Sequence, residues 1–270
     1  RQVYEDSHKQ YTEVVDKAFS EITEKVKNIA DNVMAKNGTL VYNSLGFERS
    51  DIVTINGKTV ESGPIPAYGW KVVEAAEPRC KVKLDGRTAE NDYFILTLDQ
   101  EGRILRLYDK RFKREVFKEG KLGNELQIFE DMPLVFENWE IAEYYADKCR
   151  LLDNVAEIIP VSDGCRAGFK VMRKYHESSI TQEIYMYDTI ERIDVLNTFD
   201  WHERKQLMKI AFPFDIHTDK AVFDIQFGNV ERTISSNTSW DRAKFEVCGH
   251  KWVDLSEYGY GVSILNDCKY

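Results

Sequence analysis

The sequence predicts a mainly β protein in which one long N-terminal helix and a small β-module precede a large antiparallel β-sandwich. Apolar residues recur at spacings of three and four through residues 3–36, which is the period of an amphipathic helix. From residue 38 onward short runs alternate between apolar and polar residues and are separated by turn residues. Residues 80–270 hold no amphipathic helical pattern, and many strands without intervening helices are typical of a sandwich.

These patterns divide the chain into three parts. Residues 1–37 form the helix, residues 38–77 the small β-module and residues 78–270 the large sandwich. Residues 74–78, with two alanines and a proline, are the best linker candidate. The sequence has no initiator Met, and Tyr270 falls inside an expected strand. We therefore expect an excised piece of a longer protein, with the sandwich truncated at its C-terminal end.

The helix has one apolar stripe and a mixed-charge outer face. Members of the stripe include Val15, Phe19, Ile22 and Val26. Lys36, Asn37 and Gly38 supply a cation for the last turn and a residue that tolerates the left-handed conformation, so the helix should stop there. Mixed rather than basic charges favour a helix from a helical bundle over a helix on a membrane surface. An uncovered stripe of this size usually finds a partner, and we expect a homo-oligomer to form through it.

The small β-module is predicted from four short runs, at residues 40–42, 52–55, 59–60 and 70–73. Asn56 and Gly57 separate the second run from the third, and Asn-Gly between two such runs is a strong hairpin signal.

The sandwich is predicted from a series of hairpins. Expected strand pairs are 92–98 with 103–108, 155–161 with 168–173, and 181–187 with 191–199, followed by strands at 206–212, at 222–227 and around Phe245 and Val247. Turn residues separate each pair, as an antiparallel arrangement requires.

Composition excludes several classes of protein. The 270 residues carry a net charge of −9, so no basic stripe is available for nucleic acid. No apolar run is long enough to span a membrane, and we expect no membrane partner. Five widely spaced cysteines without a CxxC pair fit a reducing, cytoplasmic compartment better than a disulfide framework.

One polar loop carries the candidate substrate-binding residues. Between the strand at residues 222–227 and the alternation at Phe245 lies a polar run containing Arg232, Asn237, Trp240 and Asp241. A guanidinium, an amide and a carboxylate can bind sugar hydroxyls, and an indole can cover the C–H face of a pyranose. The alternative is a surface loop whose Trp packs onto the sandwich.

Two further clusters admit two interpretations each. Residues 200–204 are dense in ionisable groups and are best explained as a solvated corner, with Trp201 covering the edge of the core. Residues 130–145 form an acidic and aromatic loop that could border a sugar cleft or pair with a neighbouring domain.

Five blocks of sequence resemble a known family in the family's own order. They lie at residues 40–53, 126–145, 196–216, 237–257 and 260–270. Together they are similar to the C-terminal part of glycoside hydrolase family 38, the zinc-dependent alpha-mannosidases, and most like the branch that includes the cytosolic enzymes. The chain departs from the family at Thr233, Ile234 and Ser235, where members usually read Pro-Thr-His.

The resemblance implies a β-supersandwich similar to galactose mutarotase, preceded by the last helix of a bundle. It also implies that the nucleophile and the zinc ligands belong to an N-terminal α/β domain of the parent protein. We therefore expect no catalytic residue, no metal ligand and no cofactor in this chain, and zinc in the parent's catalytic domain. His217 and Asp219 have the His-x-Asp form used for zinc, but a zinc site needs three or four convergent ligands, and His217 is expected in a turn.

Three functions follow. In the first, the chain is the non-catalytic region of an alpha-mannosidase that hydrolyses terminal α-linked mannose with retention, and it completes the wall of the active site. Its partners are then the catalytic domain and, through the parent, a mannose-containing oligosaccharide. In the second, the chain is a stand-alone glycan-binding module. In the third, it is a structural scaffold that touches no sugar.

Overall fold

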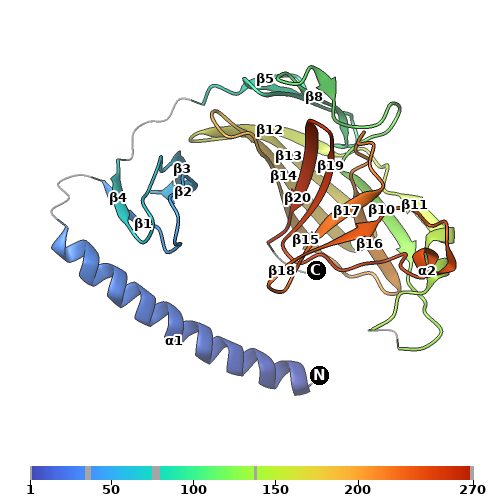
Figure 1. Ribbon diagram of the computed structural model, residues 1–270, viewed down its shortest axis with the longest axis horizontal. Helices are drawn as coiled ribbons and strands as arrows, with labels where there is room; N and C mark the ends of the chain where they lie inside the picture. The colour runs from blue at the N-terminus through green and yellow to red at the C-terminus, as the bar shows by residue number, and fades with distance from the viewer. Residues whose placement is uncertain (1, 34–37, 75–79, 137–138, 268–270) are drawn as a thin grey trace. The chain divides into compact units, whose positions relative to one another are not determined.

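The computed structural model describes residues 2–33, 38–74, 80–136 and 139–267, which form two compact units. The first unit comprises Arg1–Cys80 with Ser162–Arg166, and the second comprises Lys81–Val161 with Ala167–Tyr270. Antiparallel strands dominate the second unit, and the first contains one long helix, which opens the chain, and short antiparallel strands (Figure 1). The mainly β fold predicted from the sequence is therefore confirmed.

The opening helix, α1, runs over Gln2–Asn32 without a break (Figure 1). None of its described residues is buried, and the stripe side chains Val15, Phe19 and Ile22 are exposed at 45%, 65% and 57%. Of the predicted stop, Lys36 and Asn37 lie outside the described residues, whereas Gly38 has the expected left-handed backbone with φ +115°. The apolar stripe is thus present as predicted, and its side chains face outward.

The small β-module contains four short strands in two antiparallel pairs. Its strands are β1 (Thr39–Tyr42), β2 (Ile52–Ile55), β3 (Lys58–Glu61) and β4 (Trp70–Val73), with β1 paired to β4 and β2 to β3. Asn56 and Gly57 form the predicted two-residue turn, with φ of 52° and 76°. Ile55, Val60 and Val73 form its small core. The predicted linker, apart from Glu74, lies outside the described residues.

A hairpin tip distant in sequence completes this first unit. Residues Ser162–Arg166 belong to it, and they bind the main chain of Thr59 in β3. The Thr59 N–H donates to Asp163 Oδ1 at 3.2 Å, and the Cys165 N–H donates to the Thr59 carbonyl at 3.1 Å. A four-strand module of this size is marginal alone, and these bonds extend its pairing.

The second unit is built from four antiparallel sheets. The first contains β5 (Lys83–Asp85), β6 (Thr88–Glu90), β7 (Phe94–Leu98), β8 (Ile104–Asp109) and β9 (Arg114–Glu115) in that order. The second has the order β11 (Cys149–Leu151), β10 (Glu125–Glu130), β16 (Gln206–Ala211). The third contains β12 (Glu157–Asp163), β13 (Arg166–Tyr175), β14 (Ser178–Tyr187) and β15 (Ile193–Asp200). The fourth has the order β18 (Gly228–Thr233), β17 (Lys220–Ile225), β19 (Trp252–Glu257), β20 (Tyr260–Leu265).

The predicted hairpins agree with these strands, with one exception. Residues 245–247 are not a strand, and β19 begins only at Trp252. The reason lies in the contacts of Tyr145: its ring lies 6.2 Å from the Phe245 ring, and its hydroxyl lies 2.5 Å from Glu246 Oε1. Neighbouring residues of a strand point to opposite faces, so Phe245 and Glu246 could not both contact Tyr145 from a strand.

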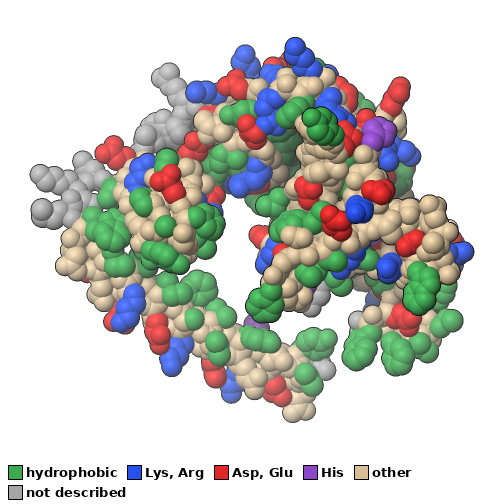
Figure 2. Space-filling model, viewed as in Figure 1, with side chains coloured by type: hydrophobic (Ala, Val, Ile, Leu, Met, Phe, Trp, Pro, Cys, Tyr) green, Lys and Arg blue, Asp and Glu red, His purple; other side chains and the backbone are tan. Residues whose placement is uncertain are grey.

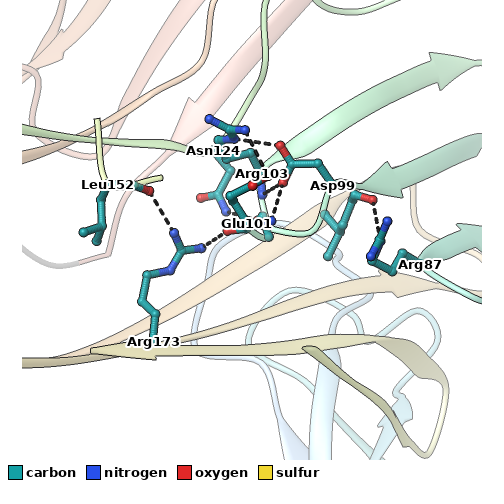
Figure 3. Close-up of polar contacts among 9 residues, drawn as sticks. Arg87, Asp99, Glu101, Arg103, Asn124, Leu152 and Arg173 are labelled. Atoms are coloured by element: carbon teal, nitrogen blue, oxygen red, sulfur yellow. Dashed lines mark hydrogen bonds and ion pairs between the residues drawn. The ribbon is translucent and has the colours of Figure 1, made fainter. Parts of the chain in front are cut away.

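A buried polar network joins three of the four sheets (Figure 3). From β13, Arg173 donates to the Leu152 carbonyl at 3.2 Å and to the Glu101 carbonyl in the turn between β7 and β8. From β14, Gln182 exchanges hydrogen bonds of 2.9 and 3.2 Å with Asn124, which precedes β10. Arg173, Gln182 and Asn124 are buried, and burial lowers the pKa of Arg173 even though Asp99 acts to raise it.

The turn between β7 and β8 must come close to β13 for this network to form. Asp99 organises the turn by accepting from the N–H groups of Glu101 and Arg103 and from Arg103 Nε at 2.7 Å (Figure 3). At Gly102 a Cβ would lie 2.3 Å from Val171 and 3.0 Å from Arg173 Nη2. The approach therefore requires glycine, quite apart from its φ of +74°.

We expect Gly102→Ala to destabilise the chain much more than Gly120→Ala. Both glycines have positive φ, +74° and +71°, so both alanines meet the left-handed penalty of about 1–2 kcal/mol. A Cβ at Gly120 would meet nothing within 4 Å, so only Gly102→Ala adds an overpacking cost of about 1–3 kcal/mol. Urea unfolding of the two variants measures the difference. Equal losses would show that the turn does not need its close approach to Val171.

Candidate functional site

The candidate site is built on the hairpin of β17 and β18. The strands pair with Ala221 opposite Arg232 and Phe223 opposite Val230, so all four side chains share one face. This places the Arg232 guanidinium 4.7 Å above the Phe223 ring. Arg232 Nη1 also donates to the Cys248 carbonyl at 2.6 Å. The sequence placed Arg232 in a loop, but β18 extends to Thr233 and holds the side chain on a strand.

The departure from the family pattern at Thr233 forms a local turn. Thr233 Oγ1 lies 2.9 Å from Ser235 Oγ and accepts the Ser235 N–H at 3.2 Å. The Ile234 N–H donates to the Asp219 carbonyl at 3.1 Å. Hydroxyl side chains that bind the backbone two residues on stabilise turns, so this chain ends β18 with a Thr–Ser turn.

Asp241 is held by a short helix, α2, which spans Ser239–Arg242. Thr238 caps this helix: its Oγ1 accepts the Asp241 N–H at 3.1 Å and donates to Asp241 Oδ2 at 2.6 Å. One carboxylate oxygen of Asp241 is thereby fixed in place. Thr238 is the kind of residue that N-caps prefer.

Arg232 and Asp241 line one surface depression of about 630 Å³. Apolar side chains share its wall: Phe223, Val230, Ile234, Phe245 and Val247. Asn237 and Trp240, the other two predicted residues, are exposed and do not line it. The Trp240 side chain is 80% exposed, so the alternative in which it packs onto the sandwich is wrong.

A set of contacts that the sequence did not predict, called here a clamp, holds residues 242–246, which follow Asp241. Glu143, at the start of the 3₁₀ helix η1 (Glu143–Lys148), pairs with Arg242 at 2.5 Å. From β16, Lys209 Nζ contacts Glu246 and lies 2.8 Å from the Tyr145 hydroxyl. Burial acts to lower the pKa of Lys209, but its bonds to Glu246 and Tyr145 outweigh burial and leave that pKa raised. Tyr145 lies in the acidic and aromatic loop of residues 130–145, and that loop was the only feature of the sequence that indicated this clamp.

A second clamp, centred on Arg114 of β9, anchors the fourth sheet. Arg114 Nη1 donates to Glu257 Oε1 at 2.6 Å, Nη2 donates to the Asp215 carbonyl at 2.5 Å, and the guanidinium lies 4.2 Å from the centre of the Tyr260 ring. The bond from Arg114, followed by the His217 backbone N–H, lowers the pKa of Glu257. Glu257 ends β19, so the clamp fixes the strand next to β17.

The other predicted clusters have structural explanations. His217 is exposed, and its Nε2 lies 3.9 Å from Asp215 Oδ1. In the described part of the chain no three His, Cys, Asp or Glu residues lie together in a way that could hold a metal ion. Trp201 stacks on Tyr175 at 5.7 Å and packs against the core beside β10, which confirms that it covers the core edge. No helix among the described residues is both long and apolar enough to cross a membrane.

Comparison with known proteins identifies the region that contains this site. The model of the family described as "Glycosyl hydrolases family 38 C-terminal domain" matches residues 89–270, about two thirds of the chain. The chain belongs to this family. Both clamps and all four predicted substrate-binding residues fall within the matched glycosyl hydrolase family 38 region.

The curated relatives are alpha-mannosidases that are much longer than this chain. Human "Alpha-mannosidase 2C1" is 29% identical over 253 residues, covering 86% of this chain and 24% of the relative. "Alpha-mannosidase G" of Dictyostelium discoideum is 32% identical over 247 residues, covering 86% and 21%. This family 38 chain thus spans about a quarter or less of the length of these relatives.

Solved structures agree with the fold. The crystal structure of an alpha-mannosidase from Enterococcus faecalis V583 superposes with a TM-score of 0.59 at 12% identity, covering 90% of this chain and 33% of that one. At this identity the likeness shows the fold alone.

We expect the free energy of unfolding to decrease less on acidification in Glu257→Gln than in the wild type. The folded-state pKa of Glu257 is depressed, so its pairing stabilises the chain above the unfolded pKa of about 4.3 and is lost as the pH falls through the lower folded value. Urea unfolding of the wild type and the variant between about pH 3 and pH 7 measures this. Arg114→Gln should give the same smaller decrease because it removes the other partner. Parallel pH profiles in all three proteins would contradict the clamp.

Proposed function

We propose that the chain is the C-terminal β region of an alpha-mannosidase, in which the Arg232–Asp241 depression forms part of the wall that binds terminal mannose. One observation supports the proposal above others. Two oppositely charged, planar side chains, one from a strand and one from a helix, line the same depression inside a family 38 domain. The backbone elements and the two clamps hold them rigidly, as a preorganised site requires.

The chemistry of the depression suits a sugar. Arg232 has five N–H donors, of which Nη1 binds the Cys248 carbonyl, and Asp241 has two acceptor oxygens, of which Oδ2 binds Thr238. Their remaining groups match a pair of neighbouring hydroxyls on a pyranose. The rings of Phe223 and Phe245 offer apolar surface for its C–H groups.

The parent enzyme then hydrolyses terminal α-linked mannose with retention, which needs two carboxyl groups about 5 Å apart. In this proposal both carboxyl groups and the zinc ligands belong to the parent's catalytic domain. The proposal includes a cytoplasmic location. The chain's partners are the parent's catalytic domain and a mannose-containing oligosaccharide.

The stand-alone glycan-binding module is the second candidate. It is favoured by Trp240, because an indole that is 80% exposed is the kind of surface on which a sugar ring can stack. The two candidates differ in whether the chain binds glycan without the parent.

We expect Asp241→Ala in the full-length parent to lower kcat/KM about 10- to 100-fold, the equivalent of one lost charged hydrogen bond. Urea unfolding of the chain should be nearly unchanged because Asp241 is not buried. The control is Asp85→Ala, an exposed carboxylate in the first sheet, which should leave the kinetics unchanged. Release of product from an aryl α-mannoside is the assay, and the 270-residue chain alone should release none.

Two results would contradict this proposal. Unchanged kinetic constants for Asp241→Ala would make the chain a scaffold. Glycan binding by the isolated chain that is lost in Trp240→Ala would instead support the binding module. Because Trp240 is exposed, that variant should fold normally, and a loss of glycan binding would then report the loss of the indole itself.

We also propose that α1 brings two isolated chains together through its apolar stripe. Phe19→Glu should weaken self-association at least about tenfold, since it buries a charge in the contact, as measured by sedimentation velocity. Ser20→Glu adds the same charge on the opposite face of the helix and should have little effect. A wild-type chain that stays monomeric at high concentration would contradict the proposal.

A further inference from the structure

The loop between β10 and η1 displays an apolar patch on the surface. The patch consists of Met132, Leu134, Val135, Phe136 and Trp139, with Leu134 exposed at 89% and Trp139 at 91%. Hydrophobic side chains gather over this loop in Figure 2, and the loop lies beside α2 in Figure 1. Such residues usually occupy a core, and a contiguous exposed group of them commonly marks an interaction surface.

Hydrogen bonds tie the described parts of this loop together. The N–H groups of Trp139 and Glu140 donate to the Phe136 carbonyl at 2.7 and 3.0 Å, and Phe136 has φ +57°. The Tyr144 hydroxyl donates to the Met132 carbonyl at 3.1 Å. A preformed surface loses less conformational freedom when it binds.

The patch is continuous with the candidate site. Tyr144 binds Met132 at one end of the loop, and the adjacent Glu143 pairs with Arg242 of α2. Trp240, two residues before Arg242 in α2, adds a further exposed indole. A partner that covers the Asp241 side of the depression therefore also meets the patch.

Charge and shape narrow the kinds of partner that can bind the patch. Asp131 and Glu140 flank the patch in the sequence, so a matching surface carries Lys or Arg beside an apolar centre. The rings of Phe136 and Trp139 can stack on a sugar, whereas Met132, Leu134 and Val135 offer no ring face and suit an apolar protein surface. Both features favour a protein surface.

We propose that this patch docks against the part of the parent polypeptide that lies outside these 270 residues, on an apolar face bordered by Lys and Arg. The inference rests on the proposed function, which sets the neighbouring depression against that part of the parent. Matches to the curated relatives cover only 24% and 21% of their length, so most of such a polypeptide is available as the partner.

The test is amide hydrogen exchange at residues 134–136 in the full-length parent and in the isolated 270-residue chain. We expect exchange at least about tenfold slower in the parent, because docking excludes water from the loop. In the parent, Leu134→Asp should restore fast exchange there. Tyr258→Ser removes a fully exposed aromatic residue from the turn between β19 and β20, and should leave the slow exchange intact.

Other results overturn the inference or the proposed function, and they can be told apart. Equal exchange in the two proteins shows that nothing covers the patch. Slowing in the isolated chain that grows with its concentration identifies a second copy, and slowing caused by added oligomannose identifies a glycan surface. Slow exchange in the parent with normal kinetics for Asp241→Ala would overturn the proposed function alone. Fast exchange in the parent with impaired kinetics for that variant would overturn this inference alone.

Discussion

The arrangement of the second unit depends on the buried contact that Arg173 makes between sheets. Apolar packing is non-directional and tolerates small shifts between sheets, whereas a buried guanidinium must find acceptors at fixed positions or lose several kcal/mol. Arg173 finds them on two neighbouring sheets at once, and Gln182 and Asn124 repeat the link beside it. These bonds also require glycine at position 102, because the turn that offers the Glu101 carbonyl must lie against Val171 and leaves no room for a side chain.

The candidate site inherits its geometry from this arrangement. β10 is tied to the network through Asn124 and leads into the loop and η1, while its neighbour β16 carries Lys209. Lys209 therefore reaches Glu246 from a sheet whose position is already set, and Tyr145 reaches it from η1, which follows β10. On the other side Arg114 fixes the end of β19. Arg232 and Asp241 line the depression. Their residue types alone are a weak signal of a site, and contacts with residues far away in the sequence set their positions.

The sequence predicted what is encoded locally. Asn56–Gly57 and the hairpins of the sandwich depend on turn residues and alternation within a few positions, and they are present as expected. The alternation at Phe245 and Val247 was misleading because Tyr145, a hundred residues earlier, holds two neighbouring side chains on one side. Arg232 and Asp241 were found from their residue types, but their meeting, and the exposure of Trp240, depend on the strand register and the Thr238 cap.

The Arg232–Asp241 depression and the apolar patch are joined through the same two bonds, between Glu143 and Arg242 and from Tyr144 to Met132. In the proposed arrangement, docking of the patch therefore sets where Asp241 lies relative to the groups that perform the chemistry. Catalysis is sensitive to displacements of about 1 Å, which can cost about a hundredfold in rate. A region without a nucleophile can thus control turnover through its interface as strongly as through its own contacts with the sugar. This coupling distinguishes a wall of the active site from a module that binds glycan independently.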